Sequence, residues 1–254
     1  MGVKMPDIVI DSINNDEITA DNISFNLLRN IAGSENCSIT WQSLGYGRNI
    51  LNSTKQLDQY LYTYGPMIES QWSQICNNLN IDQGNITILD YGCGQGLASL
   101  LFLDYCQDNF REDVEQVILI EPSKVALNRA ERIVQCCYPN AEIRSVCHTF
   151  NDVTPTHLET NDQHIKIHLM SNVLDIPGYD HFELIRKLGE SKGTHYFIAI
   201  GHDRDFAGGS GRLEELFNAI IESDGLKELV SESRLERYTC NNKPAIGFVL
   251  KLEL

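Results

Sequence analysis

From residue 85 onward, short apolar runs alternate with segments whose apolar residues recur at helical spacing. The apolar runs predict strands at residues 85–91, 116–121, 142–149, 164–170 and 194–200. The clearest amphipathic helix carries Leu213, Leu216, Phe217, Ile220 and Ile221. Strands that alternate with helices in this way are typical of an α/β protein, in which a mostly parallel sheet is covered by helices on both faces.

Local signals mark where two of the helices begin and how the chain ends. Ser123 and Asp180 are expected to cap helices, the second with Glu183 in a variant of the capping box. The final residues change to an alternation of period two, with Ile246, Phe248, Leu250 and Leu252 on one side. Residues 234–239 offer a partner strand across Asn241-Asn242. We therefore predict a doubly wound, seven-stranded sheet that ends in an antiparallel strand pair.

The N-terminal part shows helical patterns only. Asp21 is expected to cap a helix that ends at Gly33. A longer apolar stripe covers residues 57–79 and is interrupted at Gly65-Pro66, which predicts two consecutive helices, the second beginning at Pro66. We therefore expect an N-terminal helical cap, which forms the substrate region, at residues 1–84, and a sheet domain at residues 85–254.

Size and charge restrict the class of partner. The 254 residues suffice for a substantial core, and 42% hydrophobic residues is typical of a globular protein. The formal net charge of −15 disfavours a protein that grips nucleic acid over a wide surface, because such binding uses clustered Lys and Arg. A local basic pocket is still compatible with this charge. No signal peptide or membrane-spanning run is evident, so we expect a cytoplasmic protein with a small molecule or another protein as its partner.

The eight cysteines do not form a metal or redox motif. No C-x-x-C spacing occurs, so we expect neither a zinc site nor a reactive dithiol. Their positions in predicted helices, in a predicted strand and in a glycine-rich loop favour small buried side chains in a reducing compartment.

The most distinctive motif runs from Ile88 to Gly96, where an apolar strand leads into Asp90 and then into glycines at positions 92, 94 and 96. Glycines let the backbone turn tightly and approach a ligand, and a helix that begins there directs free N–H groups at the same place. A pyrophosphate-binding loop has the spacing G-x-G-x-x-G and no carboxylate beside the anion. The spacing G-x-G-x-G after a carboxylate favours a cationic ligand that lacks phosphate.

This loop resembles motif I of the class I S-adenosylmethionine-dependent methyltransferases. The resemblance implies that S-adenosylmethionine is the cofactor and that the loop binds it through Asp90, Gly92, Cys93, Gly94 and Gly96. It also implies a Rossmann-like fold whose terminal strand is antiparallel.

The resemblance continues through the second strand, Val117 to Glu121, which ends in a carboxylate as in that family. This match implies that Glu121, with Pro122 beside it, contacts the ribose of the cofactor. Two adjacent hydroxyl groups are well served by the paired oxygens of one carboxylate. NAD-binding folds use the same chemistry, so Glu121 alone does not choose between the two cofactors.

The loops after the third and fourth strands match two further contact regions of the family. Phe150 is expected to stack on the adenine, with Thr149 or Asp152 accepting from its amino group; the alternative is a core Phe beside solvated polar residues. Ser171 and Asn172 match the position that faces the sulfonium and the acceptor. The segment lacks the prolines and the aromatic residue of the nucleobase amino methyltransferases, which argues against methylation of an exocyclic amine.

Three residues are candidates for catalysis. Asn172 can position groups by hydrogen bonds, and Asp175 is either a base or a loop residue. His202 is the first choice for a general base, because the carboxylates near it in sequence can tune a histidine; a solvated loop is the alternative. The glycines at positions 208, 209 and 211 suit a segment that opens and closes over a substrate.

Aromatic residues are dense between Trp41 and Trp72. Tyr46, Tyr60 and Tyr62 are expected to line an acceptor pocket under the cap, where ring faces attract a cation. The alternative is that these rings anchor the cap onto the core.

Three functions compete on the sequence alone. The leading hypothesis is an S-adenosylmethionine-dependent methyltransferase that acts on a small-molecule or protein acceptor. The second is a catalytically silent module of the same fold that binds the cofactor or a protein partner. The third, a nicotinamide-dependent oxidoreductase, is disfavoured by the glycine spacing and by the terminal hairpin.

Overall fold

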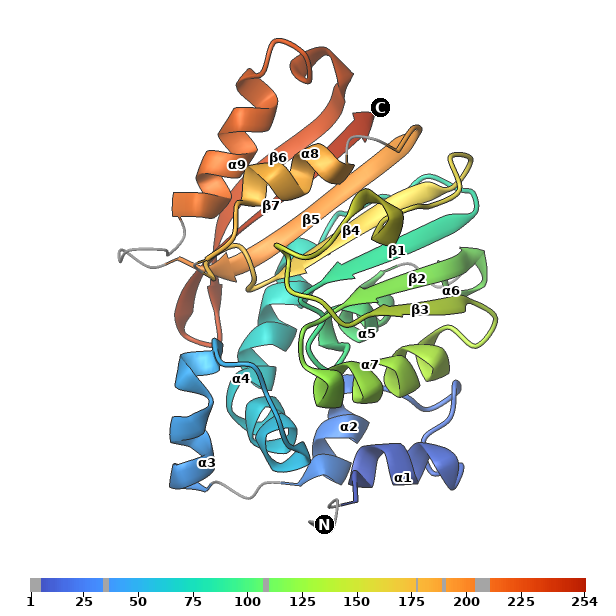
Figure 1. Cartoon of the computed structure of the whole chain (residues 1–254), viewed down its shortest axis with the longest axis vertical. Coiled ribbons are helices and arrows are strands. Elements are labelled where there is room, and N and C mark those ends of the chain that lie inside the picture. Colours follow the sequence, from blue (N-terminus) through green and yellow to red (C-terminus); the bar gives the residue numbers. More distant parts are fainter. Residues whose placement is uncertain (1–5, 34–36, 107–109, 177, 189–190, 204–210) are drawn as a thin grey trace.

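The computed structural model describes residues 6–33, 37–106, 110–176, 178–188, 191–203 and 211–254 (Figure 1). The strands are β1 (Ile86–Tyr91), β2 (Val114–Ile120), β3 (Glu142–Val146), β4 (Ile165–Ser171), β5 (Thr194–His202), β6 (Val230–Cys240) and β7 (Lys243–Glu253). In the described residues they form one seven-stranded sheet of order β3-β2-β1-β4-β5-β7-β6. The first five strands pair in parallel and β7 is antiparallel to β5 and β6, which confirms the predicted architecture.

Helices cover both faces of the sheet. They are α1 (Ile8–Asn14), α2 (Phe25–Ala32), α3 (Ser38–Ser43), α4 (Thr54–Ile75), α5 (Leu97–Tyr105), α6 (Phe110–Asp113), α7 (Lys124–Cys137), α8 (His181–Leu188) and α9 (Gly211–Glu222). One face packs against α4, α5 and α7, and the other against α8 and α9. In Figure 1 the N-terminal helices, in blue, lie with α4 at the end of the molecule opposite α9. In the described part of the chain, no helix has the length and apolar character needed to cross a membrane.

Side-chain caps fix where several helices begin. Ser123 Oγ accepts from the N–H of Ala126, and Asp180 Oδ1 accepts from the N–H groups of Phe182 and Glu183, so both predicted caps are confirmed. The Glu183 side chain accepts from Arg186 and does not complete the predicted capping box. The predicted start of α2 at Asp21 is wrong, because Ser24 Oγ accepts from Leu27 N and the helix begins after it.

The break predicted at Pro66 is also wrong, since α4 is one continuous helix with Pro66 inside it. Proline in a helix costs about 3 kcal/mol through its lost hydrogen bond and its clash with the preceding turn. The apolar stripe on both sides of Pro66 is buried, and each such side chain contributes roughly 1.5 to 3 kcal/mol. Burial of the stripe therefore outweighs the proline penalty. This stripe comprises Leu57, Leu61, Ile68, Trp72 and Ile75.

The terminal hairpin turns at Asn241-Asn242, whose φ angles of 48° and 59° are those of a tight hairpin turn. Both strands are longer than predicted, and β6 is one of the two outermost strands of the sheet, with β3 at the other edge. The Arg234 guanidinium donates to the backbone carbonyls of Ile75 and Asn77, at 2.7 and 2.9 Å. These bonds attach the hairpin to the C-terminal end of α4.

Two cysteines depart from the expectation of burial. Cys37 precedes α3 and is exposed, and Cys147 is exposed as well. The strand predicted to reach residue 149 ends at Val146, so Cys147 lies in the following loop. Its thiol donates a weak hydrogen bond to the carbonyl of Pro122 at 3.6 Å.

Candidate functional site

A cleft of about 400 Å³ opens at the carboxyl ends of β1, β2 and β4. It is bordered by the glycine loop (residues 92–96), by the loops after β2, β3 and β4, by α4, and by a strap that we define as residues 47–51. The predicted site residues that line it are Tyr60, Gly92, Cys93, Gly94, Glu121, Pro122, Thr149, Phe150, Ser171 and Asn172. Residues between Gly47 and Tyr179 therefore meet at one edge of the sheet, where open α/β sheets bind ligands.

All three glycines of the loop have positive φ angles, and at two of them a side chain would also lack space. Gly96 has a φ of 85°, and a Cβ there would lie 3.2 Å from the Cα of Ala130 on α7. Gly92 has a φ of 61°, and its Cβ would lie 2.6 Å from a methyl group of Val173. Both positions need the left-handed backbone and a close approach. A Cβ on Gly94 would meet nothing within 4 Å, so the loop leaves open space there.

Asp90 does not line the cleft. Its carboxylate is fully buried and turned towards α5, where Oδ2 accepts from the N–H and the hydroxyl of Ser99 at 3.2 and 2.7 Å. Among the described residues, Oδ1 has no hydrogen-bond partner. Burial raises the pKa of the Asp90 carboxyl to about 7, against the opposing effect of the two bonds from Ser99. In this conformation Asp90 fixes the N-terminal turn of α5 behind the loop.

The substitution Asp90→Asn tests this arrangement. A carboxyl that titrates near pH 7 when folded and near pH 4 when unfolded binds more protons in the folded state between these values, so stability falls as pH rises. Between pH 5 and pH 8, we expect the free energy of unfolding of the wild type to fall by about 2 to 3 kcal/mol more than that of Asp90→Asn. Urea unfolding of both proteins at both pH values measures this difference. An identical pH dependence would contradict the raised pKa of Asp90.

Glu121 connects the second strand to the glycine loop. Its Oε2 accepts from Gly94 N–H at 3.1 Å, and its Oε1 accepts from Ser123 N–H at 2.8 Å. Burial raises the pKa of this carboxyl, while the two backbone amides favour its charged form. Each oxygen keeps a lone pair for a ligand in the cleft.

Aromatic residues form a second wall of the cleft. The rings of Phe150 and Tyr179 lie 4.7 Å apart between centroids, and both line the cleft. The Thr149 hydroxyl donates to Asp152 Oδ2 at 2.6 Å, which orders the loop after β3. The two rings are tilted by 58°, so the wall offers the apolar face of each ring, with the Asp152 carboxylate in the adjoining loop.

Helix α4 fixes the residues that follow β4. Gln71 and Asn172 exchange two amide hydrogen bonds, at 3.2 and 2.8 Å. Ser171 Oγ accepts from Trp72 Nε1 at 3.1 Å and from the Asn172 side chain at 3.4 Å. Because both lone pairs of the Ser171 oxygen are occupied, its hydroxyl hydrogen is left to donate. Sequence reasoning missed Gln71 and the hydrogen bond that Trp72 donates to Ser171.

The strap is a further part of the site that sequence reasoning missed. The Ser123 hydroxyl donates to the carbonyl of Leu51, and Leu51 packs with Leu44, Leu57 and Ala126. The strap is thereby attached to the N-terminal turn of α7. Its residues have no regular periodicity, so only Gly45 and Gly47 around Tyr46 signalled a turn.

Three further predicted site residues do not line the cleft. Gly96 packs against α7, and Asp175 forms a 3.9 Å ion pair with Arg48 of the strap. His202 ends β5 and pairs with Ala245 of β7. The glycines at positions 208 and 209 lie outside the described residues.

The two other predicted aromatic residues do not line the cleft either. The Tyr46 side chain is 75% exposed and contacts Trp41 edge to face. Tyr62 lies under the guanidinium of Arg29, 5.8 Å from its ring centroid.

No protein-family model matches the chain, and no curated protein matches its sequence. Among solved structures, the plantazolicin methyltransferase BpumL in complex with a pentazolic desmethylPZN analog and SAH is 13% identical, with a TM-score of 0.52 over 96% of this chain and 99% of that one. The mitomycin 7-O-methyltransferase MmcR is 15% identical, with a TM-score of 0.50 over 97% of this chain and 68% of that one. This chain has the fold of the class I S-adenosylmethionine-dependent methyltransferases.

Proposed function

We propose that this chain is an S-adenosylmethionine-dependent methyltransferase that acts on a small-molecule or protein acceptor. The observation that carries the proposal is the position of Glu121, which borders the cleft and joins Gly94 of the glycine loop to Ser123 through its two oxygens. A carboxylate fixed in this way is suited to the paired hydroxyl groups of a ribose. The fold and the bound SAH of a structural neighbour support the same cofactor.

The residues of the cleft fit that cofactor. Gly94 leaves space in which a ligand can approach the backbone, and Glu121 keeps free lone pairs beside that space. The ring of Phe150 offers a face for the adenine, and Asp152, held by the hydroxyl of the cleft residue Thr149, is the proposed acceptor for its amino group. A nicotinamide dinucleotide fits less well, because the glycines at positions 92, 94 and 96 lack the G-x-G-x-x-G spacing of a pyrophosphate loop and the sheet ends in the antiparallel strand β7.

When bound, S-adenosylmethionine supplies an electrophilic methyl group on a sulfonium. Transfer of that group is an in-line displacement that depends mainly on proximity and alignment, so the chain's task is to hold and orient the acceptor. The Ser171 hydroxyl and the Asn172 side chain, both fixed by α4, are the proposed orienting groups. Tyr60 contributes an aromatic ring to the lining of the same cleft, which favours a positively charged group.

Acceptor deprotonation has two candidates outside the cleft lining. Asp175 lies in the loop after β4 and forms an ion pair with Arg48 of the strap. His202 is the last residue of β5. Their roles as bases stay predictions. The strap and α4 are the proposed acceptor-selecting elements, since both belong to the N-terminal region and both border the cleft.

Thermal unfolding with S-adenosylhomocysteine, in parallel with NAD, tests the cofactor. A ligand at one hundred times its dissociation constant adds about 2.7 kcal/mol of stability. We expect this to raise the midpoint by roughly 5 to 10 °C with S-adenosylhomocysteine and not with NAD. A shift with NAD alone would overturn the proposal in favour of an oxidoreductase.

Activity then separates the enzyme from the catalytically silent module. A screen with a labelled methyl donor, over small molecules and over protein fractions, is expected to find transfer to an acceptor. Binding of S-adenosylhomocysteine without transfer to any acceptor would favour the silent module.

A further inference from the structure

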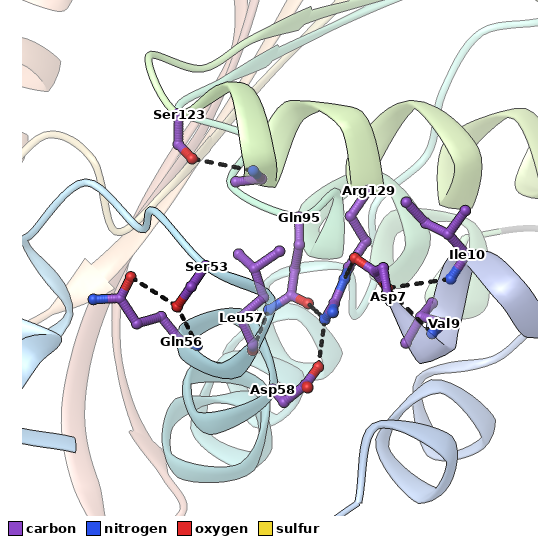
Figure 2. A network of polar contacts seen from close by, with 11 residues as sticks. Asp7, Val9, Ile10, Ser53, Gln56, Leu57, Asp58, Gln95, Ser123 and Arg129 are labelled. Atoms are coloured by element: carbon purple, nitrogen blue, oxygen red, sulfur yellow. Dashed lines mark hydrogen bonds and ion pairs between the residues drawn. The ribbon is translucent and has the colours of Figure 1, made fainter. Parts of the chain in front are cut away.

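Arg129 of α7 is fully buried and holds four elements together (Figure 2). Its Nε donates to Asp7 Oδ2 at 2.8 Å, and its Nη1 donates to Asp58 Oδ1 at 2.8 Å. The same Nη1 donates to the side-chain oxygen of Gln95 at 3.1 Å. Asp7 caps α1, Asp58 belongs to α4, and Gln95 belongs to the glycine loop. One guanidinium therefore connects α7, both parts of the N-terminal region and the cofactor loop.

Gln95 transmits the position of this cluster to the loop. Its Nε2 donates to the carbonyl of Leu57 at 3.0 Å, and its side chain is buried. The glycine loop is thereby fixed from behind, by α7 on one side and by the first turn of α4 on the other. Figure 2 shows the Gln95 side chain directed at both partners. Its neighbour Gly94 contacts Glu121, so a displacement of Gln95 shifts the proposed ribose site.

The charge of Arg129 links the docking of α1 to the position of Gln95. A buried guanidinium is tolerated only when anionic partners compensate its lost hydration. Asp7 provides one of the two carboxylates, and only 10% of its side chain is exposed. If α1 undocks, Arg129 loses the carboxylate of Asp7, and its guanidinium must move to find another partner. Because the hydrogen bond to Gln95 comes from the same guanidinium, that movement disturbs it.

We infer that Arg129 is a positioning residue that couples the docking of α1 to the shape of the glycine loop. Since coupling between two sites is reciprocal, a ligand that fixes the loop also strengthens the docking of α1. The part of this inference that concerns the cofactor rests on the proposed function.

The first test measures the loop without any ligand. Asp7→Asn keeps the cap of α1, because Asn is an equally good capping residue, but it turns an amide N–H₂ towards Arg129. We expect amide hydrogen exchange in the glycine loop and the first turn of α5 to accelerate about fivefold or more. Asp11→Asn, which removes the same charge from an exposed position of α1, is expected to leave this exchange unchanged. Exchange in β7 reports the global loss of stability, and in Asp7→Asn exchange in the glycine loop is expected to accelerate more than exchange in β7.

The second test measures S-adenosylhomocysteine affinity by calorimetry in a double-mutant cycle of Asp7→Asn and Gln95→Met. Asp7→Asn is expected to weaken binding about fivefold to twentyfold in the wild-type background. In the Gln95→Met background, where the connection is cut, the same change is expected to alter affinity less than twofold. Effects that multiply in the double variant would show that Asp7 acts independently of Gln95 and would overturn the inference.

The two tests separate the two claims. Unchanged loop exchange in Asp7→Asn overturns the coupling, whatever the ligand. Accelerated loop exchange in a chain that does not bind S-adenosylhomocysteine supports the coupling and overturns the proposed function.

Discussion

Arg129→Met is expected to destabilise the protein by about 3 to 5 kcal/mol, the cost of removing one partner from a buried charge cluster. Methionine fills most of the space of the arginine side chain, so the loss comes mainly from charge and hydrogen bonding. Asp7 and Asp58 then face each other's charge without the guanidinium between them. Burial already raises the pKa of Asp58, so this carboxylate takes up a proton more readily as pH falls. The loss, measured by urea unfolding, is therefore expected to be smaller at pH 5 than at pH 8.

Two comparisons test whether the destabilisation of Arg129→Met comes from the buried charge cluster and not merely from removing an arginine of α7. Arg132→Met changes an exposed arginine of the same helix and is expected to alter the free energy of unfolding by less than about 0.5 kcal/mol. Combining Arg129→Met with Asp7→Asn and Asp58→Asn removes the uncompensated charges and should restore much of the stability. An Arg129→Met protein as stable as the wild type would contradict the charge cluster described here.

Glu121→Ala is expected to weaken S-adenosylhomocysteine binding about a hundredfold or more. The variant removes the two carboxylate oxygens that we assign to the ribose, and hydrogen bonds to charged groups are worth about 1.5 to 3 kcal/mol each. It also leaves the N–H groups of Gly94 and Ser123 without their acceptor, which loosens the glycine loop. Calorimetric titration of both proteins measures the difference.

Matched variants make the result specific. Glu131→Ala removes a carboxylate from an exposed position of α7 and is expected to leave affinity unchanged. Glu121→Gln keeps the shape but directs an N–H₂ group at a backbone N–H, so it should lose nearly as much affinity as the alanine variant. Wild-type affinity in Glu121→Ala would show that the ribose assignment is wrong.

The features that the sequence predicts correctly are encoded locally. The alternation of strands and helices, the cap at Ser123 and the turn at Asn241-Asn242 each depend on a few neighbouring residues. The glycine spacing predicts the loop for the same reason, because a left-handed backbone at Gly96 is a local requirement. Parallel strands end at one edge of the sheet, so the meeting of Glu121 with Gly94 also follows once the fold is known.

What the sequence does not reveal depends on contacts between distant residues. Arg129 and Asp7 are 122 positions apart, and nothing near either residue marks it as buried. The direction of the Asp90 carboxylate is decided by Ser99, which a motif-based interpretation treats only as part of a helix. The continuity of α4 through Pro66 is decided by the burial of its stripe against the sheet.

The position of β6 at the border of the sheet bears on the solubility of the folded protein. An outermost strand exposes unpaired backbone groups that can join a strand of another molecule and start aggregation. In β6 the exposed side chains include Glu232, Glu236 and Arg237. A strand of another molecule that paired with β6 would place its side chains next to these charged groups and would partly desolvate them, which is unfavourable. The terminal hairpin thus completes the sheet with a strand that discourages self-association.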